Sequence, residues 1–166
     1  KPQDFEYKTA YFKPFGQKKK MICWLVSNWK SNFRVSFYKE LKKYANIDVY
    51  GKKKTFLIKR RIPTPKCSII SNYKFYLSFE NCNLTDYITE KLWYNSFICG
   101  TIPIVLGATK EEILKQNIPS DSFIYAKDFP NASELMKYVE MVGNNETLYN
   151  SYFNWRKGRD IYYEDK

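Results

Sequence analysis

The sequence contains no histidine among its 166 residues. This absence excludes Ser–His–Asp triads, zinc sites with histidine ligands and histidine-based pH switches. Glycine is also scarce, with 6 residues, and no segment matches the GxGxxG or GxxxxGK[ST] phosphate-binding patterns. A dinucleotide fingerprint and a P-loop are therefore excluded. Any acid–base chemistry must use carboxylates, lysine, tyrosine, cysteine or a residue of another chain.

Long apolar runs and metal-binding motifs are missing as well. No apolar run approaches the ~18–20 residues that cross a bilayer, and the first ten residues, KPQDFEYKTA, do not form a signal peptide. The 4 cysteines show no CxxC pair and no metal-ligand spacing. We expect Cys23 and Cys99, which lie in apolar runs, to be buried thiols. The Asp-x-Asp cradle for a metal–diphosphate complex is also absent.

The residues that are abundant indicate one basic, folded domain. Hydrophobic residues make up 44% and aromatic residues 19% of the chain, which is enough to build a core. The 28 Lys and Arg against 17 Asp and Glu give a formal net charge of +11. Such a surplus favours an anionic partner, whether nucleic acid, a phosphate-bearing small molecule or an acidic lipid surface.

Apolar runs of strand length alternate with segments of helical periodicity. We expect strands at Met21–Val26, Ile47–Tyr50, Phe75–Phe79, Ile102–Leu106 and Phe123–Tyr125. We expect helices at Phe33–Tyr44, from Ile88 or Thr89 to Cys99, and at Thr109–Gln116, Ala132–Val142 and Glu146–Trp155. The first helix would bury Phe37, Leu41 and Tyr44, and residues 51–72, rich in lysine, would have little regular structure. The repeated strand–helix–strand units predict an α/β fold, a Rossmann-like parallel sheet with helices on both faces.

Two loops are the candidate ligand site, because ligands of open parallel sheets bind beyond the carboxyl ends of the strands. These loops are residues 27–34 and 80–91. Arg34 and Lys91 each stand in the first turn of a predicted helix, where the helix N-terminus also favours anions. A diphosphate would suit this pair, but two ordinary surface cations would give the same pattern. By spacing alone, Glu90 is best explained by its interaction with the helix dipole.

Several segments, in order along the chain, resemble the signature of the α1,3/α1,4-fucosyltransferases. The most specific is YKFYLSFEN at 73–81, continued by DYITEKLWYN at 86–95. The others are WLVSN at 24–28 with Arg34 and YKEL at 38–41, GTIPIVLG at 100–107, IPSDSF at 118–123 and YFNWR at 152–156. The resemblance extends from about residue 20 to residue 158 and so covers nearly the whole chain.

What the resemblance implies is the C-terminal, GDP-fucose-binding half of a GT-B glycosyltransferase. Members of the family are inverting, metal-independent enzymes that transfer L-fucose to a GlcNAc hydroxyl of a glycan acceptor, here in α1,3 linkage. Carried over by position, Arg34 and Lys91 would neutralise the diphosphate of the donor, and Glu90 and Asn81 would contact its sugar hydroxyls. Further donor-pocket residues implied by the resemblance are Tyr87, Ser27, Asn28 and Glu80. No cofactor and no metal are expected.

The same resemblance implies a particular domain organisation. Residues 1–20 would be a lead-in from an N-terminal acceptor domain that is missing from this chain, and residues 21–166 would form the donor-binding domain. The catalytic general base would belong to the missing domain, so we expect donor binding with little or no transfer. Family members are single-pass type II membrane proteins of the Golgi. We therefore expect a lumenal domain whose membrane anchor is absent here.

Three features of the sequence leave alternatives open. Sequons at Asn83, Asn131 and Asn145 fit a lumenal glycoprotein, and we expect Asn83 to be unused because a glycan there would crowd the donor loop. The lysine-rich stretch after Gly51 lacks a cysteine that the family often has, so the disulfide pattern is open. A nucleotide-sugar-binding module without catalysis remains the alternative function. We expect no nucleic-acid partner, because the aromatic residues follow core periodicity rather than lining a basic face.

Overall fold

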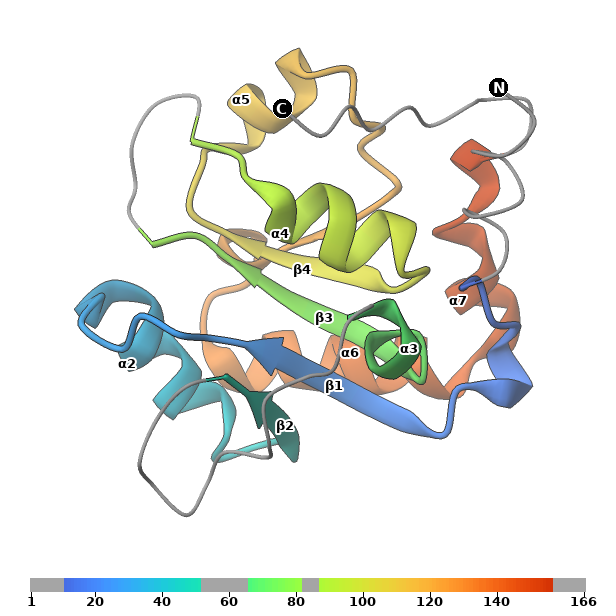
Figure 1. The fold of residues 1–166 in the computed structure, drawn as a ribbon, viewed down its shortest axis with the longest axis horizontal. Helices are drawn as coiled ribbons and strands as arrows, with labels where there is room; N and C mark the ends of the chain where they lie inside the picture. The colour runs from blue at the N-terminus through green and yellow to red at the C-terminus, as the bar shows by residue number, and fades with distance from the viewer. Residues whose placement is uncertain (1–10, 52–65, 82–86, 157–166) are drawn as a thin grey trace.

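The computed structural model describes residues 11–51, 66–81 and 87–156 and contains a five-stranded sheet of order β2-β1-β3-β4-β5 (Figure 1). The strands are β1 (Lys20–Leu25), β2 (Ile47–Tyr50), β3 (Tyr73–Phe79), β4 (Ile102–Leu106) and β5 (Ile124–Tyr125). Every pair of neighbouring strands is parallel. The predicted parallel sheet is therefore confirmed: β2 and β4 have the predicted ends, and the ends of the other strands lie within two residues of the prediction.

The order of the strands changes direction between β1 and β3. The chain runs outward from β1 to β2, returns to the other side of β1 as β3, and continues through β4 to β5. At such a point the loops that follow the two central strands turn away from each other and leave a crevice between them. The loops predicted to bind a ligand, 27–34 and 80–91, are the two loops that begin there.

Helices occupy both faces of the sheet. They are α2 (Asn32–Leu41), α3 (Cys67–Ile70), α4 (Glu90–Leu92), α5 (Lys110–Lys115), α6 (Ala132–Asn144) and α7 (Glu146–Ser151). Short 3-10 turns form at η1 (Phe15–Gln17), η3 (Ala126–Asp128) and η4 (Asn154–Arg156), and the π-helix η2 (Trp93–Ile98) continues α4. None of the helices in these described residues is both long and apolar enough to span a bilayer.

The core is divided between the two faces because successive strand residues point to opposite sides. Trp24 and Leu77 pack with α2, α6 and α7, whereas Cys23 and Tyr76 pack with α3 and the end of η2. A third cluster joins Val105 to η2 and α5. In Figure 1, α3 lies in front of the strands and α6 behind them. The prediction of helices on both faces is confirmed.

Helix α2 ends earlier than its sequence pattern predicts. Its last residue is Leu41, and the backbone N–H of Ala45 then bonds back to Leu41 as the chain turns toward β2. The turn leaves Tyr44 55% exposed, so the prediction that Tyr44 is buried was wrong. Leu41 is buried, as predicted, and the buried face also carries Val35 and Tyr38. The Tyr38 ring centroid lies 4.8 Å from that of Trp24.

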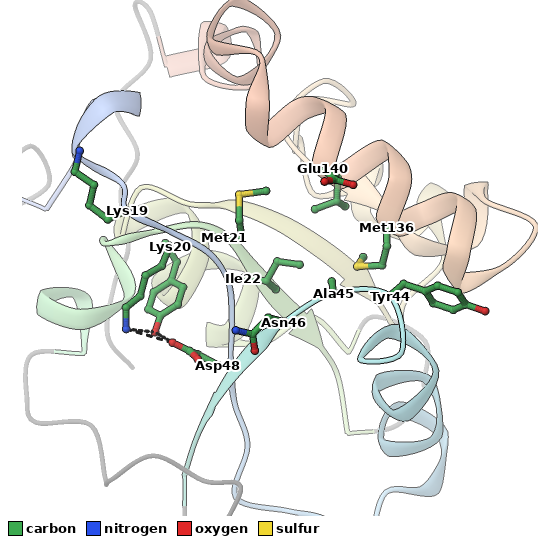
Figure 2. A pocket seen from close by; sticks show the side chains of 12 residues that line it. Lys19, Lys20, Met21, Ile22, Tyr44, Ala45, Asn46, Asp48, Met136 and Glu140 are labelled. Carbon is green, nitrogen blue, oxygen red and sulfur yellow. Dashed lines mark hydrogen bonds and ion pairs between the residues drawn. The ribbon is translucent and has the colours of Figure 1, made fainter.

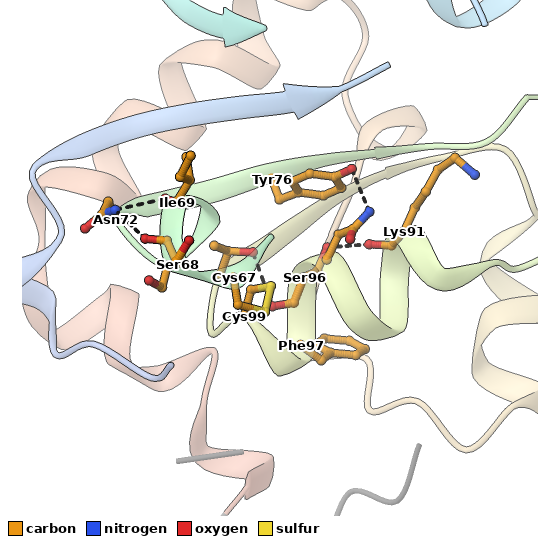
Figure 3. The surroundings of a disulfide bond; sticks show 12 residues. Cys67, Ser68, Ile69, Asn72, Tyr76, Lys91, Ser96, Phe97 and Cys99 are labelled. Carbon is orange, nitrogen blue, oxygen red and sulfur yellow. Dashed lines mark hydrogen bonds between the residues drawn. A yellow bond between two sulfur atoms is a disulfide. The ribbon is translucent and has the colours of Figure 1, made fainter. Parts of the chain in front are cut away.

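The structure corrects two further predictions, one about the segment 51–72 and one about the thiol of Cys99. Part of the 51–72 segment, residues 52–65, lies outside the described residues, but α3 forms within the remainder. Cys99 is buried as predicted, yet it is not a free thiol, because it forms a disulfide with Cys67 of α3 (Figure 3). The two cysteines are 32 residues apart and meet only because α3 and η2 cover the same sheet face. Cys23 is the buried free thiol that we expected, and burial raises its pKa.

A cavity of about 550 Å³ opens at the amino edge of the sheet, where the strands begin. Figure 2 shows Lys20 and Asp48 at one end of this cavity, joined by an ion pair of 3.2 Å, and Met21 and Met136 farther along its wall. Ligands of open parallel sheets bind at the opposite, carboxyl edge. This cavity is therefore separate from the candidate site.

Candidate functional site

The loops after β1 and β3 are joined directly by hydrogen bonds. The hydroxyl of Ser31 donates to the backbone carbonyl of Asn81 at 2.6 Å. The guanidinium of Arg34 donates through Nη1 to the carbonyl of Phe79 at 3.1 Å and through Nη2 to that of Asn28 at 2.6 Å. Arg34 thus ties the start of α2 to both loops at the point where the strand order changes direction.

Arg34 is almost completely buried, with 2% of its surface exposed. Its Nε atom makes no hydrogen bond with any described residue, and it forms no ion pair with a described carboxylate. A buried guanidinium N–H without a partner is costly, which makes this atom available to an anionic group that reaches it. Burial lowers the pKa of Arg34, while the negative charge of Glu80 acts in the opposite direction.

Lys91 stands in the first turn of α4, as predicted, but its side chain is turned into the protein. Its Nζ atom lies 3.0 Å from Oε2 of Glu80 and 2.8 Å from Oγ1 of Thr89. Glu90 is farther away, with 3.6 Å between its Oε1 and Lys91 Nζ, and its side chain is 50% exposed. The side chains of Lys91 and Glu80 are only 11% and 4% exposed.

Glu80 is the centre of this cluster. Its carboxylate accepts hydrogen bonds from the backbone N–H of Thr89 at 2.9 Å and from the Thr89 hydroxyl at 2.8 Å, in addition to the ammonium of Lys91. Gly107, with φ of +144°, leaves the space for it, since a Cβ there would come within 2.7 Å of the Glu80 Cβ. In this structure the Glu80 carboxylate therefore binds protein groups, and its part is to hold Lys91.

Thr89 is a site residue that the sequence reasoning missed. It is the N-cap of α4, and its hydroxyl bridges the Glu80 carboxylate and the Lys91 ammonium. The available signal was a threonine directly before a predicted helix, which is a preferred N-cap residue. That signal predicts a helix start, but it does not show that the same hydroxyl contacts two charged groups.

The other residues implied by the resemblance lie around this cluster. Ser27, Asn28 and Glu90 are exposed, whereas Asn81 and Tyr87 are half-buried. The Asn28 side chain accepts a hydrogen bond from the N–H of Lys30 at 3.0 Å and so fixes the turn after β1. Oδ1 of Asn81 is buried without a hydrogen-bond partner among the described residues. The structure thus brings all the predicted residues to the carboxyl edge of the sheet, at the ends of β1 and β3.

The electrostatics of the site suit an anion. Among the buried groups of the cluster there are two cations, Arg34 and Lys91, and one carboxylate, Glu80, while the second carboxylate near Lys91, Glu90, is half-exposed to solvent. Hydrogen bonds between charged groups contribute about 1.5–3 kcal/mol each, and more where water is excluded. An anion that reaches both cations would complete their hydrogen bonding.

Residues 15–165 match the protein family described as glycosyltransferase family 10 (fucosyltransferase), C-terminal. The chain belongs to this family. The match covers the sheet, the helices and every residue of the candidate site. The resemblance drawn from the sequence motifs is therefore confirmed.

Relatives with curated names agree with this membership in the fucosyltransferase family. The chain is 50% identical over 143 residues to mouse 4-galactosyl-N-acetylglucosaminide 3-alpha-L-fucosyltransferase 9, covering 84% of this chain and 38% of that protein. It is 38% identical over 153 residues to bovine alpha-(1,3)-fucosyltransferase 4, covering 90% of this chain and 37% of that protein. The chain thus spans less than two fifths of the length of the relatives it matches.

Solved structures show the same fold. An alpha1,3-fucosyltransferase crystal structure superimposes with a TM-score of 0.72 at 25% identity, covering 88% of this chain and 39% of that one. A structure of an alpha1,3-fucosyltransferase with GDP superimposes with a TM-score of 0.73 at 24% identity, covering 92% of this chain and 44% of that one. The predicted fold, the C-terminal half of a GT-B enzyme, is confirmed.

Proposed function

We propose that this chain is the donor-binding half of an α1,3-fucosyltransferase and that it binds GDP-L-fucose. The observation that carries the proposal is the buried cluster of Lys91, Glu80 and Thr89 beside Arg34, at the strand crossover where ligands of such sheets bind. Membership in the fucosyltransferase family and a fold shared with an alpha1,3-fucosyltransferase crystal structure support it.

The donor diphosphate is the group that Arg34 and Lys91 suit best. Arg34 offers a planar fork and an Nε–H that bonds to no described residue, and Lys91 offers a compact ammonium. Glu80 and Thr89 hold the lysine side chain before the ligand arrives, which reduces the entropy lost on binding. Glu90 and Asn81 would then contact the hydroxyls of fucose, with Tyr87, Ser27 and Asn28 completing the pocket.

The reaction would proceed as a single inverting displacement. The acceptor hydroxyl of GlcNAc attacks the anomeric carbon of fucose, the bond from that carbon to the β-phosphate oxygen breaks, and GDP leaves. The negative charge that develops on the diphosphate is stabilised by Arg34 and Lys91, so on this proposal no metal ion is required. A base outside this chain takes the proton of the acceptor hydroxyl.

The proposal includes a place for the chain within a longer protein. Residues 1–20 would lead in from an acceptor-binding domain that supplies the base and selects the glycan, and residues 21–166 would form the donor domain. The full protein would be a type II membrane protein with this part in the Golgi lumen. The buried disulfide between Cys67 and Cys99 supports a lumenal location, because disulfides persist in oxidising compartments.

The test is a calorimetric titration of the folded 166-residue chain with GDP-fucose, with and without EDTA, and with ADP-glucose as the control ligand. We expect binding of GDP-fucose that EDTA does not change, no binding of ADP-glucose, and loss of binding in Lys91→Ala. A folded chain that binds neither ligand would contradict the proposal, and binding abolished by EDTA would contradict its metal-free part. If the full-length protein binds the donor but transfers no fucose, the alternative of a binding module without catalysis is correct.

A further inference from the structure

Two of the three sequons lie in described parts of the structure, at the starts of consecutive helices. Asn131 of Asn-Ala-Ser precedes α6, and Asn145 of Asn-Glu-Thr separates α6 from α7. Both asparagines are exposed. Asn83, the third sequon, lies outside the described residues. Two exposed sequons on one side of the sheet are a feature that donor binding does not explain.

The two ends of each asparagine amide have different roles. Oδ1 of Asn131 accepts the N–H of Glu134 at 3.0 Å, and Oδ1 of Asn145 accepts the N–H of Leu148 at 2.9 Å, so both side chains cap their helices. The Nδ2 atoms make no hydrogen bond with any described residue. An N-linked glycan attaches through Nδ2 and leaves the amide oxygen in place. Capping and glycosylation are therefore compatible at both positions.

Neither position lies beside Lys91. Asn145 lies at the amino edge of the sheet. Two residues before it, the carbonyl of Gly143 accepts a hydrogen bond from the ammonium of Lys74, which is near the start of β3. Asn131 lies beyond the end of β5 and begins α6, which packs on the opposite sheet face from α4. A glycan at Asn145 would therefore lie at the sheet edge opposite the candidate site, whereas a glycan at Asn131 would lie at the carboxyl edge, on the sheet face away from Lys91.

The disulfide gives independent support for the compartment in which such a modification occurs. Both Cys67 and Cys99 are fully buried, and their bond joins α3 to the end of η2 (Figure 3). Structural disulfides of this kind form in the secretory pathway, where sequons are also modified.

We propose that Asn131 and Asn145 carry N-linked glycans while their amide oxygens cap α6 and α7. In the modification step, Nδ2 forms a bond to the anomeric carbon of a lipid-diphosphate-linked oligosaccharide. The bond from that carbon to the diphosphate oxygen breaks, the lipid diphosphate leaves, and one amide proton is lost to a base. The inference rests on the lumenal location given under the proposed function and does not depend on donor binding.

The test uses the chain secreted from eukaryotic cells, so that all recovered protein has passed through the lumen. Peptide N-glycosidase in H₂¹⁸O converts each glycosylated asparagine to ¹⁸O-labelled aspartate, which peptide mass spectrometry locates. We expect label at both residues in the parent chain. Ser133→Ala should abolish the label at Asn131 alone, and Thr147→Ala the label at Asn145 alone.

Matched variants separate the glycan from the cap. Asn145→Asp and Thr147→Ala both remove the sequon but keep a capping oxygen, whereas Asn145→Ala removes both. We expect the melting temperature to fall further in Asn145→Ala than in the other two variants, and GDP affinity to stay within twofold in all three. Absence of label at either residue in the secreted chain overturns the proposal for that residue. Loss of GDP binding in the parent chain would contradict the proposed function and leave this inference untouched.

Discussion

Two lysines are buried among the described residues, at opposite edges of the sheet and in different electrostatic environments. Lys91, at the carboxyl edge, is 9% exposed and lies 3.0 Å from the carboxylate of Glu80. Lys18, just before β1, is 3% exposed and donates only to the carbonyls of Ser71 and Tyr73, at 2.9 and 3.1 Å. It forms no ion pair within the described residues. One buried ammonium has a charged partner and the other does not.

The difference separates a structural lysine from one suited to bind a ligand. Burial without a carboxylate lowers the pKa of Lys18 to about 7, so this side chain serves to fasten the lead-in segment to the start of β3. Lys91 is held by Glu80 and Thr89 at a loop that already contains Arg34. The ammonium of Lys91 has three N–H donors and is held beside Arg34. An incoming anion can therefore accept hydrogen bonds from both cations.

The largest expected effect comes from removing the partner of Lys91. Glu80→Ala should lower the free energy of unfolding by about 3–5 kcal/mol, because it leaves a buried ammonium without its counter-charge. Urea unfolding followed by circular dichroism measures this change. Glu90→Ala is the control, since its half-exposed carboxylate should contribute less than about 1 kcal/mol. Equal losses in the two variants would show that Glu80 is no more important than a surface charge.

The disulfide fastens the far end of η2, at the amino edge where β3 and β4 begin. Reduction of Cys67–Cys99 should lower the free energy of unfolding by about 2–4 kcal/mol, because the unfolded chain gains the freedom of an open loop. Unfolding with and without dithiothreitol measures the loss. Cys23→Ala should respond to the reductant like the parent chain, and the Cys67→Ala/Cys99→Ala variant should not respond. A parent chain that is insensitive to reductant would contradict the pairing.

Ligand binding should distinguish the two lysines directly. Lys91→Met should weaken GDP binding by about 10–100-fold, which corresponds to the loss of one charge-assisted hydrogen bond of about 1.5–3 kcal/mol. Its affinity for guanosine, which has no diphosphate, should not change. Lys18→Met should bind GDP within twofold of the parent chain. Calorimetry with both ligands gives the comparison, and equal weakening of guanosine and GDP would mean a general disturbance of the pocket.

The last prediction concerns the pH dependence due to Lys18, which has the smallest effect for a single step, here one pH unit. In the folded protein its pKa is about 7, whereas the unfolded chain keeps the ordinary value of 10.5. Between these values the unfolded state binds one more proton, so the free energy of unfolding should rise with pH, by about 1.4 kcal/mol per pH unit. Below pH 7 both states are protonated and this contribution becomes constant. The measurement is the difference in unfolding free energy between the parent chain and Lys18→Met from pH 6 to 10, and a flat difference would contradict it.

Much of the fold could be predicted from the sequence because its strands are short, continuous apolar runs. Met21–Val26 and Ile102–Leu106 are each buried on both faces, a pattern typical of parallel sheets, and both formed within one residue of their predicted ends. Tyr44 was predicted wrongly because periodicity does not record where the chain must turn into the next strand. The Cys67–Cys99 disulfide could not be predicted, since it depends on two helices sharing one sheet face.

For the candidate site, the sequence by itself determined the types of side chain and the loops that carry them. Glu80 directly follows β3, and Arg34 and Lys91 stand in the first turns of the helices after β1 and β3. The motifs around these residues identify the fucosyltransferase family. Only the tertiary structure decided that Glu80 and Thr89 hold Lys91, and that Arg34 joins both loops. These contacts depend on the order β2-β1-β3, which brings together the ends of strands separated by about fifty residues of chain.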